Sequence, residues 1–140
     1  MALEYGEAGA QIASERGLSV VRADATSLPC ADDVMDLVVA FDVLEHIDDD
    51  DAAVREIHRV LRPGAVALIA VPVDPRLWSA HDEAVGHVRR YTRAELLDLF
   101  ARNGFVVERA RSWNVLLRPV VSLRRRSSSG SDLERMNPMV

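Results

Sequence analysis

Two carboxylates and an imidazole lie close together near the middle of the chain, at Asp42, Glu45 and His46. Their spacing of i, i+3 and i+4 places them on one side of a helical turn. Two carboxylates with one ring nitrogen suit Mg²⁺ or Mn²⁺, which prefer oxygen ligands with some nitrogen. In the alternative interpretation no metal binds. Asp42 then caps the turn, and His46 packs beside a ligand or acts as a general base, because imidazole titrates near neutral pH.

The element that positions this cluster is the apolar run Leu37–Phe41, which ends immediately before Asp42. A valine-rich run with charge on both sides predicts a strand that is buried on both faces of a parallel sheet. The acids at Asp48–Asp51 predict the start of a helix, Pro63-Gly64 its end, and Ala65–Val71 a second buried strand. These elements form a right-handed βαβ unit, with the cluster beyond a strand's carboxyl end, where ligands bind.

Before this unit the pattern predicts a helix, a strand and a loop. The helix is Leu3–Arg16, which Gly17 would end in the left-handed conformation. The strand is Leu18–Ala23, and Thr26–Asp33 reads as a loop because it contains a proline and paired aspartates.

The segment Asp74–Tyr91 is predicted to be a long connection, and connections of this length are usually functional or disordered. Its aromatic and histidine content favours a substrate lid, whose arginines would suit a phosphate or carboxylate. In the alternative, its histidines lie on the surface and its arginines pair with acids of the chain. The residues concerned are Trp78, His81, His87, Arg89, Arg90 and Tyr91. Thr92–Glu95 predicts a capping box that opens a helix, and Phe105–Arg109 predicts a strand.

Length and composition restrict the function further. The 140 residues suit one domain, and the net charge of -5 argues against nucleic-acid binding driven by charge. All 17 basic residues are arginine, so a P-loop lysine and Schiff-base chemistry are excluded. Cys30 is the only cysteine, which excludes an intrachain disulfide. No apolar run is long enough to span a bilayer and no signal peptide is visible, so we expect a cytoplasmic protein.

Several segments, in this order, resemble class I S-adenosylmethionine-dependent methyltransferases of the type 11 group. They are Val21–Pro29, Phe41–Ile47, Glu56–Gly64, Trp78–Glu83, Arg90–Leu96 and Asn103–Phe105. The resemblance implies an α/β fold, namely a partial Rossmann-like methyltransferase fold with three αβα layers and a mostly parallel sheet. It covers a domain at residues 1–126, and we expect the polar tail at 127–140 to be disordered.

Carried over to this sequence, the resemblance implies a binding site for S-adenosylmethionine. Asp24 would accept a hydrogen bond from the adenine amino group, while the Ala25 N–H meets the ring. Leu28 would pack near the adenine, and Phe41 and Asp42 would line the methionine end of the cofactor. The alternative for Asp24 is a turn cap at the end of its strand.

The implied activity is methyl transfer to an oxygen, nitrogen or carbon atom of a small molecule, with His46 or His87 as the base. Related small-RNA 2′-O-methyltransferases carry a Glu-x-x-Glu-His segment associated with a divalent metal, and a later histidine before a capped helix. That likeness adds His87 to Asp42, Glu45 and His46 as metal candidates. This chain has aspartate at the first position, a shorter reach, and a bound metal is the less favoured interpretation.

The chain also departs from the family. No G-x-G occurs among its seven glycines, so the cofactor's glycine-rich loop, the ribose-binding acid, the first two strands and the last strand are expected to be missing. The truncated chain would then be weak or inactive, or a non-catalytic remnant or partner subunit. An open sheet edge predicts self-association. The apolar and basic segment Asn114–Arg126 suggests, as the less favoured alternative to ordinary packing, contact with an anionic membrane surface.

Overall fold

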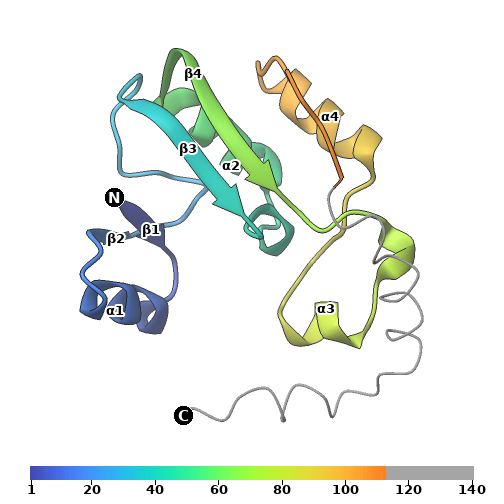
Figure 1. Ribbon diagram of the computed structural model, residues 1–140, viewed down its shortest axis with the longest axis horizontal. Helices are drawn as coiled ribbons and strands as arrows, with labels where there is room; N and C mark the ends of the chain where they lie inside the picture. The colour runs from blue at the N-terminus through green and yellow to red at the C-terminus, as the bar shows by residue number, and fades with distance from the viewer. Residues whose placement is uncertain (113–140) are drawn as a thin grey trace. The chain divides into compact units, whose positions relative to one another are not determined.

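The computed structural model describes residues 1–112 of the chain. These residues divide between two compact units, one made of Met1–Ala40 and Asp49–Ile69, the other of Phe41–Asp48 and the chain from Ala70 onward. The elements labelled in Figure 1, with two short 3-10 helices, follow in chain order: β1 (Ala2–Glu4), α1 (Glu7–Glu15), β2 (Val20–Arg22), β3 (Met35–Phe41), η1 (Leu44–His46), α2 (Asp50–Val60), β4 (Leu61–Ala70), η2 (Pro75–Leu77), α3 (Ala80–Ala84) and α4 (Arg93–Arg102).

The first unit begins with a small βαβ arrangement. β1 and β2 pair in parallel with Ala2 opposite Val20, and α1 connects them. Gly17 ends the helix with a φ of +83°, as predicted. The prediction of a helix from Leu3 was wrong, because residues 2–4 pair with β2 and the helix begins only at Glu7. A strand therefore precedes α1, where the sequence was expected to have lost it.

The second part of this unit is the strand pair β3–β4 with α2. The N–H of Val34 donates to the carbonyl of Val60, and the N–H of Asp42 to that of Ala70, so the two strands run in the same direction. The predicted α/β fold with parallel strands is thereby confirmed. Helix α2 ends at Val60 rather than at Pro63-Gly64, because the chain is already extended at Leu61, where ψ is 133°.

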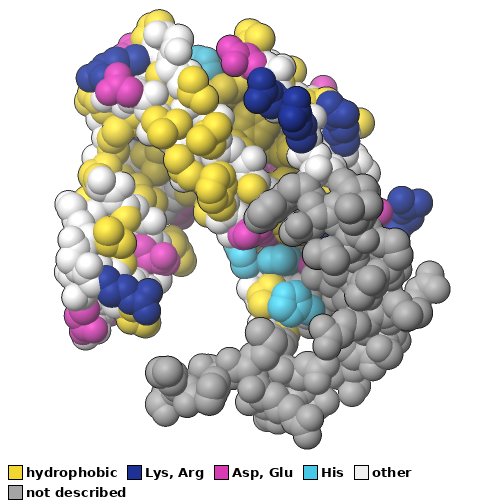
Figure 2. Space-filling view, viewed as in Figure 1, with side chains coloured by type: hydrophobic (Ala, Val, Ile, Leu, Met, Phe, Trp, Pro, Cys, Tyr) yellow, Lys and Arg dark blue, Asp and Glu magenta, His cyan; other side chains and the backbone are white. Residues whose placement is uncertain are grey.

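Only one face of β3 is covered. Ala40 is buried, whereas Leu37, Val39 and Phe41 are 50%, 51% and 58% exposed. Figure 1 shows α2 along one face of the β3–β4 pair, and Figure 2 shows hydrophobic side chains gathered over the opposite face. The prediction that β3 is buried on both faces was therefore wrong, since side chains alternate across a strand and no described element covers the second face.

The second unit holds the long connection and α4. The connection contains η2 and α3, and both α3 and α4 open with a capping box. The capping box of Thr92 and Glu95 was predicted from the sequence and is confirmed. Tyr91 is 4% exposed and donates its hydroxyl to the carbonyl of Leu44 at 3.2 Å.

Two further predictions from the sequence can be compared with the structure. The predicted strand at Phe105–Arg109 was wrong: no described strand pairs with these residues, although Phe105 stacks edge-on against Phe100 at 5.3 Å. Among the described residues no helix is long and apolar enough to cross a membrane. The segment Asn114–Arg126 and the tail from Ser127 lie outside the described residues, so the predictions made for them stay predictions.

Candidate functional site

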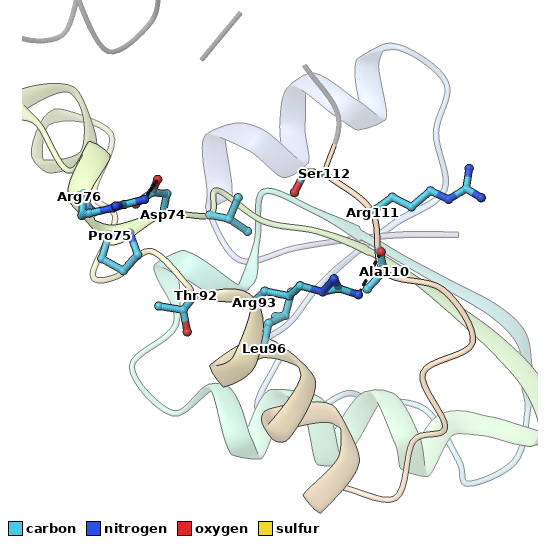
Figure 3. Close-up of a pocket in the computed structure, with 10 residues that line it drawn as sticks. Asp74, Pro75, Arg76, Thr92, Arg93, Leu96, Ala110, Arg111 and Ser112 are labelled. Carbon is cyan, nitrogen blue, oxygen red and sulfur yellow. Dashed lines mark hydrogen bonds and ion pairs between the residues drawn. The ribbon is translucent and has the colours of Figure 1, made fainter. Parts of the chain in front are cut away.

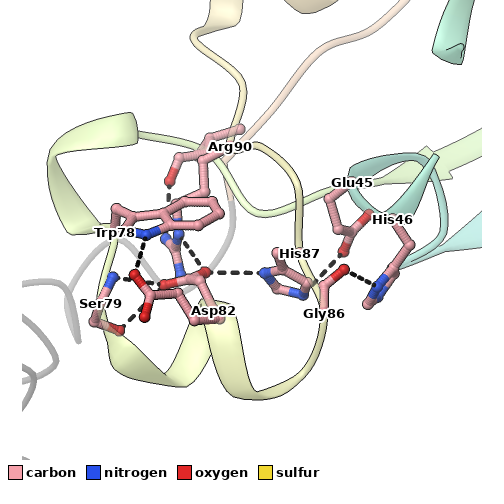
Figure 4. Close-up of polar contacts among 10 residues, drawn as sticks. Glu45, His46, Trp78, Ser79, Asp82, Gly86, His87 and Arg90 are labelled. Carbon is pink, nitrogen blue, oxygen red and sulfur yellow. Dashed lines mark hydrogen bonds and ion pairs between the residues drawn. The ribbon is translucent and has the colours of Figure 1, made fainter. Parts of the chain in front are cut away.

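Glu45, His46 and His87 come together in the second unit. The short turn η1, directly after β3, supplies Glu45 and His46, and His87 follows Gly86 at the end of the segment that contains α3. One candidate ligand atom from each residue lies within 4.8 Å of the other two. The two imidazole rings meet edge to face, with centroids 4.7 Å apart (Figure 4). The structure thus brings together three of the four residues that the sequence offered as metal candidates.

Asp42 is not part of this group. Its φ of +53° turns the chain between β3 and η1, and its N–H donates to the carbonyl of Ala70 at 2.9 Å. The expected i, i+3, i+4 arrangement on one helix does not form, because η1 is a three-residue 3-10 turn that begins only at Leu44. The ligand-type cluster in the described part of the chain is therefore Glu45, His46 and His87.

Asp82, on α3, holds His87 in place. Its carboxylate is fully buried and accepts hydrogen bonds from Arg90 Nε at 2.7 Å, His87 Nδ1 at 2.9 Å and the Ser79 N–H at 2.9 Å (Figure 4). Burial alone would raise the pKa of Asp82, but the bonds from Arg90 and His87 outweigh it and hold the pKa at about 2. An ionised carboxylate only accepts, so His87 donates from Nδ1 and keeps a lone pair on Nε2.

His46 is oriented in the same way by a different partner. Its Nδ1 lies 3.1 Å from the carbonyl oxygen of Gly86, which can only accept a hydrogen bond. The proton of His46 is thereby assigned to Nδ1, and Nε2 carries the lone pair. Both imidazoles thus offer a basic nitrogen, suitable for taking a proton or for binding a metal.

Glu45 is the unusual group of the cluster. Its side chain is fully buried, and neither carboxylate oxygen has a hydrogen-bond partner among the described residues. His87 Nε2 lies 3.9 Å from Oε1, beyond hydrogen-bond distance. Burial raises the pKa of Glu45, and the negative charge of Asp42 acts in the same direction.

In the first unit, Asp24 lies just past the carboxyl end of β2. Its Oδ1 accepts from the Thr26 N–H at 2.8 Å and from the Thr26 hydroxyl at 2.7 Å, and these bonds lower the pKa of Asp24. The turn-cap interpretation is therefore correct for Oδ1. Both bonds converge on one oxygen, which leaves Oδ2 to accept from a ligand. Ala25 is half-buried beside it.

Leu28 lies in a loop that is fixed to α2. The Leu28 N–H donates to Glu56 Oε2 at 2.7 Å, and Arg59 Nη2 donates to the Leu28 carbonyl at 3.0 Å. Arg59 also bonds the carbonyl of Cys30 and the carboxylate of Asp32, both at 2.7 Å. The segment that the resemblance places near adenine is thus held by side chains from one helix.

Glu4 was missed by the sequence analysis. It ends β1 opposite Arg22, so in the parallel pair it lies at the same carboxyl edge as Asp24. Its Oε1 accepts from the Gly6 N–H at 2.9 Å, and a Cβ at Gly9 would come 2.9 Å from its side-chain carboxyl carbon. A strand of three residues is too short to show an alternating pattern of apolar and polar residues. The signal that the sequence did offer was the acid between Leu3 and the glycines, which resembles the end of a strand followed by the start of a helix.

A cavity of about 600 Å³ lies elsewhere in the second unit (Figure 3). Arg76, Arg93 and Arg111 line it together with Leu96. Arg76 is paired with Asp74 at 2.9 Å, and Arg93 donates to the carbonyl of Ala110 at 3.4 Å.

The arginines that the sequence suggested for substrate binding have structural partners instead. Arg90 bonds Asp82, and Arg89 donates to the carbonyl of Asp48 at 2.7 Å. The alternative interpretation, in which arginines of the connection pair within the chain, is therefore correct for Arg90. His81 is exposed, as a surface histidine would be.

Comparison with known proteins shows what the chain is similar to. Residues 2–69 match the profile of a family described as "Methyltransferase domain". A probable S-adenosylmethionine-dependent methyltransferase of Mycolicibacterium smegmatis is 40% identical over 83 residues, which cover 58% of this chain and 32% of that protein. A crystal structure of an S-adenosylmethionine-dependent methyltransferase from Thermotoga maritima, titled a possible histamine N-methyltransferase, superposes with a TM-score of 0.65 at 26% identity, covering 75% of this chain and 54% of that one. Over these stretches the chain is similar to part of a class I S-adenosylmethionine-dependent methyltransferase domain.

Another relative is the chloroplastic 2-methyl-6-phytyl-1,4-hydroquinone methyltransferase 1 of rice, 30% identical over 89 residues that cover 64% of this chain and 27% of the rice protein. The chain thus spans about a third of the length of the curated relatives just described. The stretch that matches the family profile contains Glu4, Asp24 and Glu45, whereas Asp82 and His87 lie beyond its end at residue 69.

Proposed function

We propose that this methyltransferase domain transfers a methyl group from S-adenosylmethionine to an oxygen, nitrogen or carbon atom of a small molecule. The observation that carries the proposal is the pair of acids, Glu4 and Asp24, at the carboxyl edge of the parallel pair β1–β2. In open parallel sheets, ligands bind at this edge, and an acid at a strand end accepts from the ribose hydroxyls of a bound nucleotide. Glu4 supplies the acid that was expected to be missing.

The adenosine part of the cofactor would be held by acceptors of this unit. Asp24 Oδ2 accepts from the adenine amino group while its Oδ1 stays on Thr26, and the Ala25 N–H meets the ring. Leu28 packs near the ring, in a loop held by Glu56. For the methionine end, the resemblance implies Phe41 and Asp42.

For the base we favour His87 over His46. Ionised Asp82 fixes the His87 tautomer and stabilises the imidazolium that forms when Nε2 takes a proton. His46 has only the neutral Gly86 carbonyl behind it. Methyl transfer itself needs a nucleophile held in line with the methyl group and sulfur, so most of the catalysis is positioning.

The second candidate is a non-catalytic remnant or partner subunit. It is favoured by one feature of the sequence, the lack of any G-x-G among glycines 6, 9, 17, 64, 86, 104 and 130. Without that loop we expect the 140-residue chain to bind S-adenosylmethionine weakly, with millimolar affinity at best. The small-molecule acceptor, for which the rice relative's name suggests a phenol, and the cytoplasmic location stay predictions.

The two candidates separate in a titration of the ¹⁵N-labelled chain with S-adenosylmethionine, followed by amide chemical shifts. The enzyme proposal expects saturable shifts at Ala25 and Leu28 at millimolar cofactor. Asp24→Ala should weaken this binding by about 1–3 kcal/mol, roughly 5- to 150-fold, the usual cost of an unmade polar contact. Glu7→Ala, an exposed acid on α1, is the matched control and should leave the shifts unchanged.

A folded chain that shows no shifts at these amides at millimolar cofactor would favour the remnant. Shifts that persist unchanged in Asp24→Ala would remove Asp24 from the adenine site.

A further inference from the structure

We propose that the cavity at the start of α4 binds a small anionic molecule, one that carries a carboxylate or phosphate group next to an apolar part. The cavity measures about 600 Å³, within the range of roughly 300–1,000 Å³ that is typical of small-molecule sites (Figure 3). All the residues that line it belong to the second unit. None of them is proposed to bind S-adenosylmethionine or to act as the base, so the inference does not rest on the proposed function.

The lining of the cavity carries an excess of positive charge. It includes three arginines, but Asp74 is the only acid among its residues. Asp74 is matched by Arg76, whose Nε and Nη2 donate to the two carboxylate oxygens at 2.9 and 3.1 Å. Arg93 and Arg111 form no ion pair with a carboxylate in the part of the chain that the structure describes. Because the chain as a whole has a net charge of -5, this local excess of positive charge does not follow from its composition.

Arg93 is the residue best placed to bind the anion. It is the first residue of α4 and is exposed, so a ligand can reach it, and Figure 3 shows its side chain extended toward Ala110. Its Nη2 donates to the Ala110 carbonyl at 3.4 Å, which uses a single N–H of the guanidinium. The remaining N–H groups can form paired hydrogen bonds with a carboxylate or a phosphate, whose oxygens match the planar fork of arginine.

Hydrogen bonds hold the walls of the cavity together. The Asp74 N–H donates to the Tyr91 carbonyl at 2.9 Å, and Val73 and Tyr91 form a parallel bridge. This pairing joins the segment before η2 to the residue that precedes the N-cap of α4. The bond from Arg93 to the Ala110 carbonyl adds the third segment. The site is therefore formed before a ligand arrives, which lowers the conformational entropy lost on binding.

A hydroxyl and apolar side chains complete the lining. The Thr92 hydroxyl accepts from the Glu95 N–H at 3.2 Å, and its own O–H can donate to an anion. The Glu95 carboxylate does not line the cavity and accepts from the Thr92 N–H at 2.8 Å. Val73, Pro75 and Leu96 supply apolar surface, and Val73 and Leu96 are half-buried. Such a lining suits a ligand with an apolar part beside its charged group.

The test is a titration of the ¹⁵N-labelled 140-residue chain with benzoate, phenyl phosphate and benzyl alcohol, followed by amide chemical shifts. We expect saturable shifts at Val73, Leu96 and Ala110 with at least one of the two anions, and none with neutral benzyl alcohol. Comparison of the two anions distinguishes a carboxylate site from a phosphate site. Arg93→Gln keeps a side-chain N–H for the Ala110 carbonyl but removes the charge, and it should weaken anion binding about fivefold or more.

Arg102→Gln is the matched control, because it removes the same charge from the other end of α4, where Arg102 pairs with Asp98. It should bind the anions like the parent chain, and the amide spectrum of each variant checks that the fold is kept. A folded parent chain without saturable shifts for either anion would overturn the proposal. So would equal binding of benzyl alcohol, or an affinity that Arg93→Gln lowers no more than Arg102→Gln does. S-adenosylmethionine binding is measured at other amides, those of Ala25 and Leu28, so the two proposals fail independently.

Discussion

Replacing Glu56 by alanine is expected to lower the free energy of unfolding by about 2 kcal/mol. Glu56 accepts three hydrogen bonds at 2.7 Å, from the Leu28 N–H and from Nε and Nη2 of Arg59. Its side chain is 19% exposed, so water replaces these contacts poorly. The substitution therefore leaves the Leu28 N–H, part-buried in the loop before β3, without its acceptor.

The magnitude follows from three contributions. A part-buried N–H left without an acceptor costs about 1–3 kcal/mol. The ion pair with Arg59 contributes about 0.5 kcal/mol, since Arg59 is 30% exposed and keeps its bonds to Cys30 and Leu28. Alanine returns a few tenths of a kcal/mol through its higher helix propensity.

Urea unfolding at 25 °C, followed by far-UV circular dichroism, measures the difference. Glu56→Gln retains a carbonyl oxygen for Leu28 and should lose clearly less stability than Glu56→Ala. Asp98→Ala is the matched control, an acid paired with Arg102 on α4 but 71% exposed, and should stay within about 0.5 kcal/mol. Equal losses in Glu56→Ala and Asp98→Ala would refute the reasoning.

The same residue predicts a pH dependence. The bond from Arg59 holds the pKa of Glu56 below its usual value of 4.5. A carboxyl group whose pKa is lower in the folded state than in the unfolded state stabilises the folded state above pH 4.5. This contribution is lost as the pH falls through the pKa of the folded state. Glu56→Gln should therefore lose less stability than the parent chain as the pH falls below 4.5. If the free energy of unfolding of Glu56→Gln fell with pH as steeply as that of the parent chain, other carboxylates would account for the pH dependence.

Four further outcomes are expected. Gly9→Ala should displace the Glu4 carboxylate and weaken the cofactor-induced amide shifts without lowering helix stability, because its Cβ would lie 2.9 Å from the Glu4 side chain. Tyr91→Phe should cost about 1 kcal/mol in urea unfolding, since it removes a buried hydroxyl bonded to a carbonyl of η1. Light scattering should show self-association that Val39→Arg reduces, because apolar side chains on the open face of β3 are exposed. If the less favoured membrane contact of residues 124–126 occurs, the chain will co-sediment with anionic vesicles at low salt and lose this binding when these arginines become serine.

The elements that could be predicted from the sequence are those whose residues form a continuous apolar run or a helix-capping motif. The apolar runs at β3 and β4 and the capping box of Thr92 and Glu95 are of this kind. β1 was not predicted because three residues are too few to show an alternating pattern, and because its partner strand lies beyond α1 in the sequence. The open face of β3 was also not predictable, since burial depends on neighbours that a strand's own residues do not encode.

The candidate site divides in the same way. Glu45 and His46 could be singled out because they are adjacent and follow a strand, and the resemblance added His87. Asp82 could not be singled out, because a single aspartate among the chain's 22 acids gains its role only when α3 brings it to His87. Asp42 was included wrongly, since a left-handed φ at that position leaves no mark in the spacing.

The burial of Glu45 follows from how the connection is attached to η1. The Val88 N–H donates to the Glu45 carbonyl at 2.8 Å, and Tyr91 donates its hydroxyl to the carbonyl of Leu44. Both bonds end on main-chain oxygens, so they hold the connection over η1 whatever the side chain at position 45. An apolar residue there would be less costly to bury than an unpaired carboxylate. The acid therefore adds nothing to this attachment. Glu45→Gln and His87→Ala should therefore both leave the attachment intact.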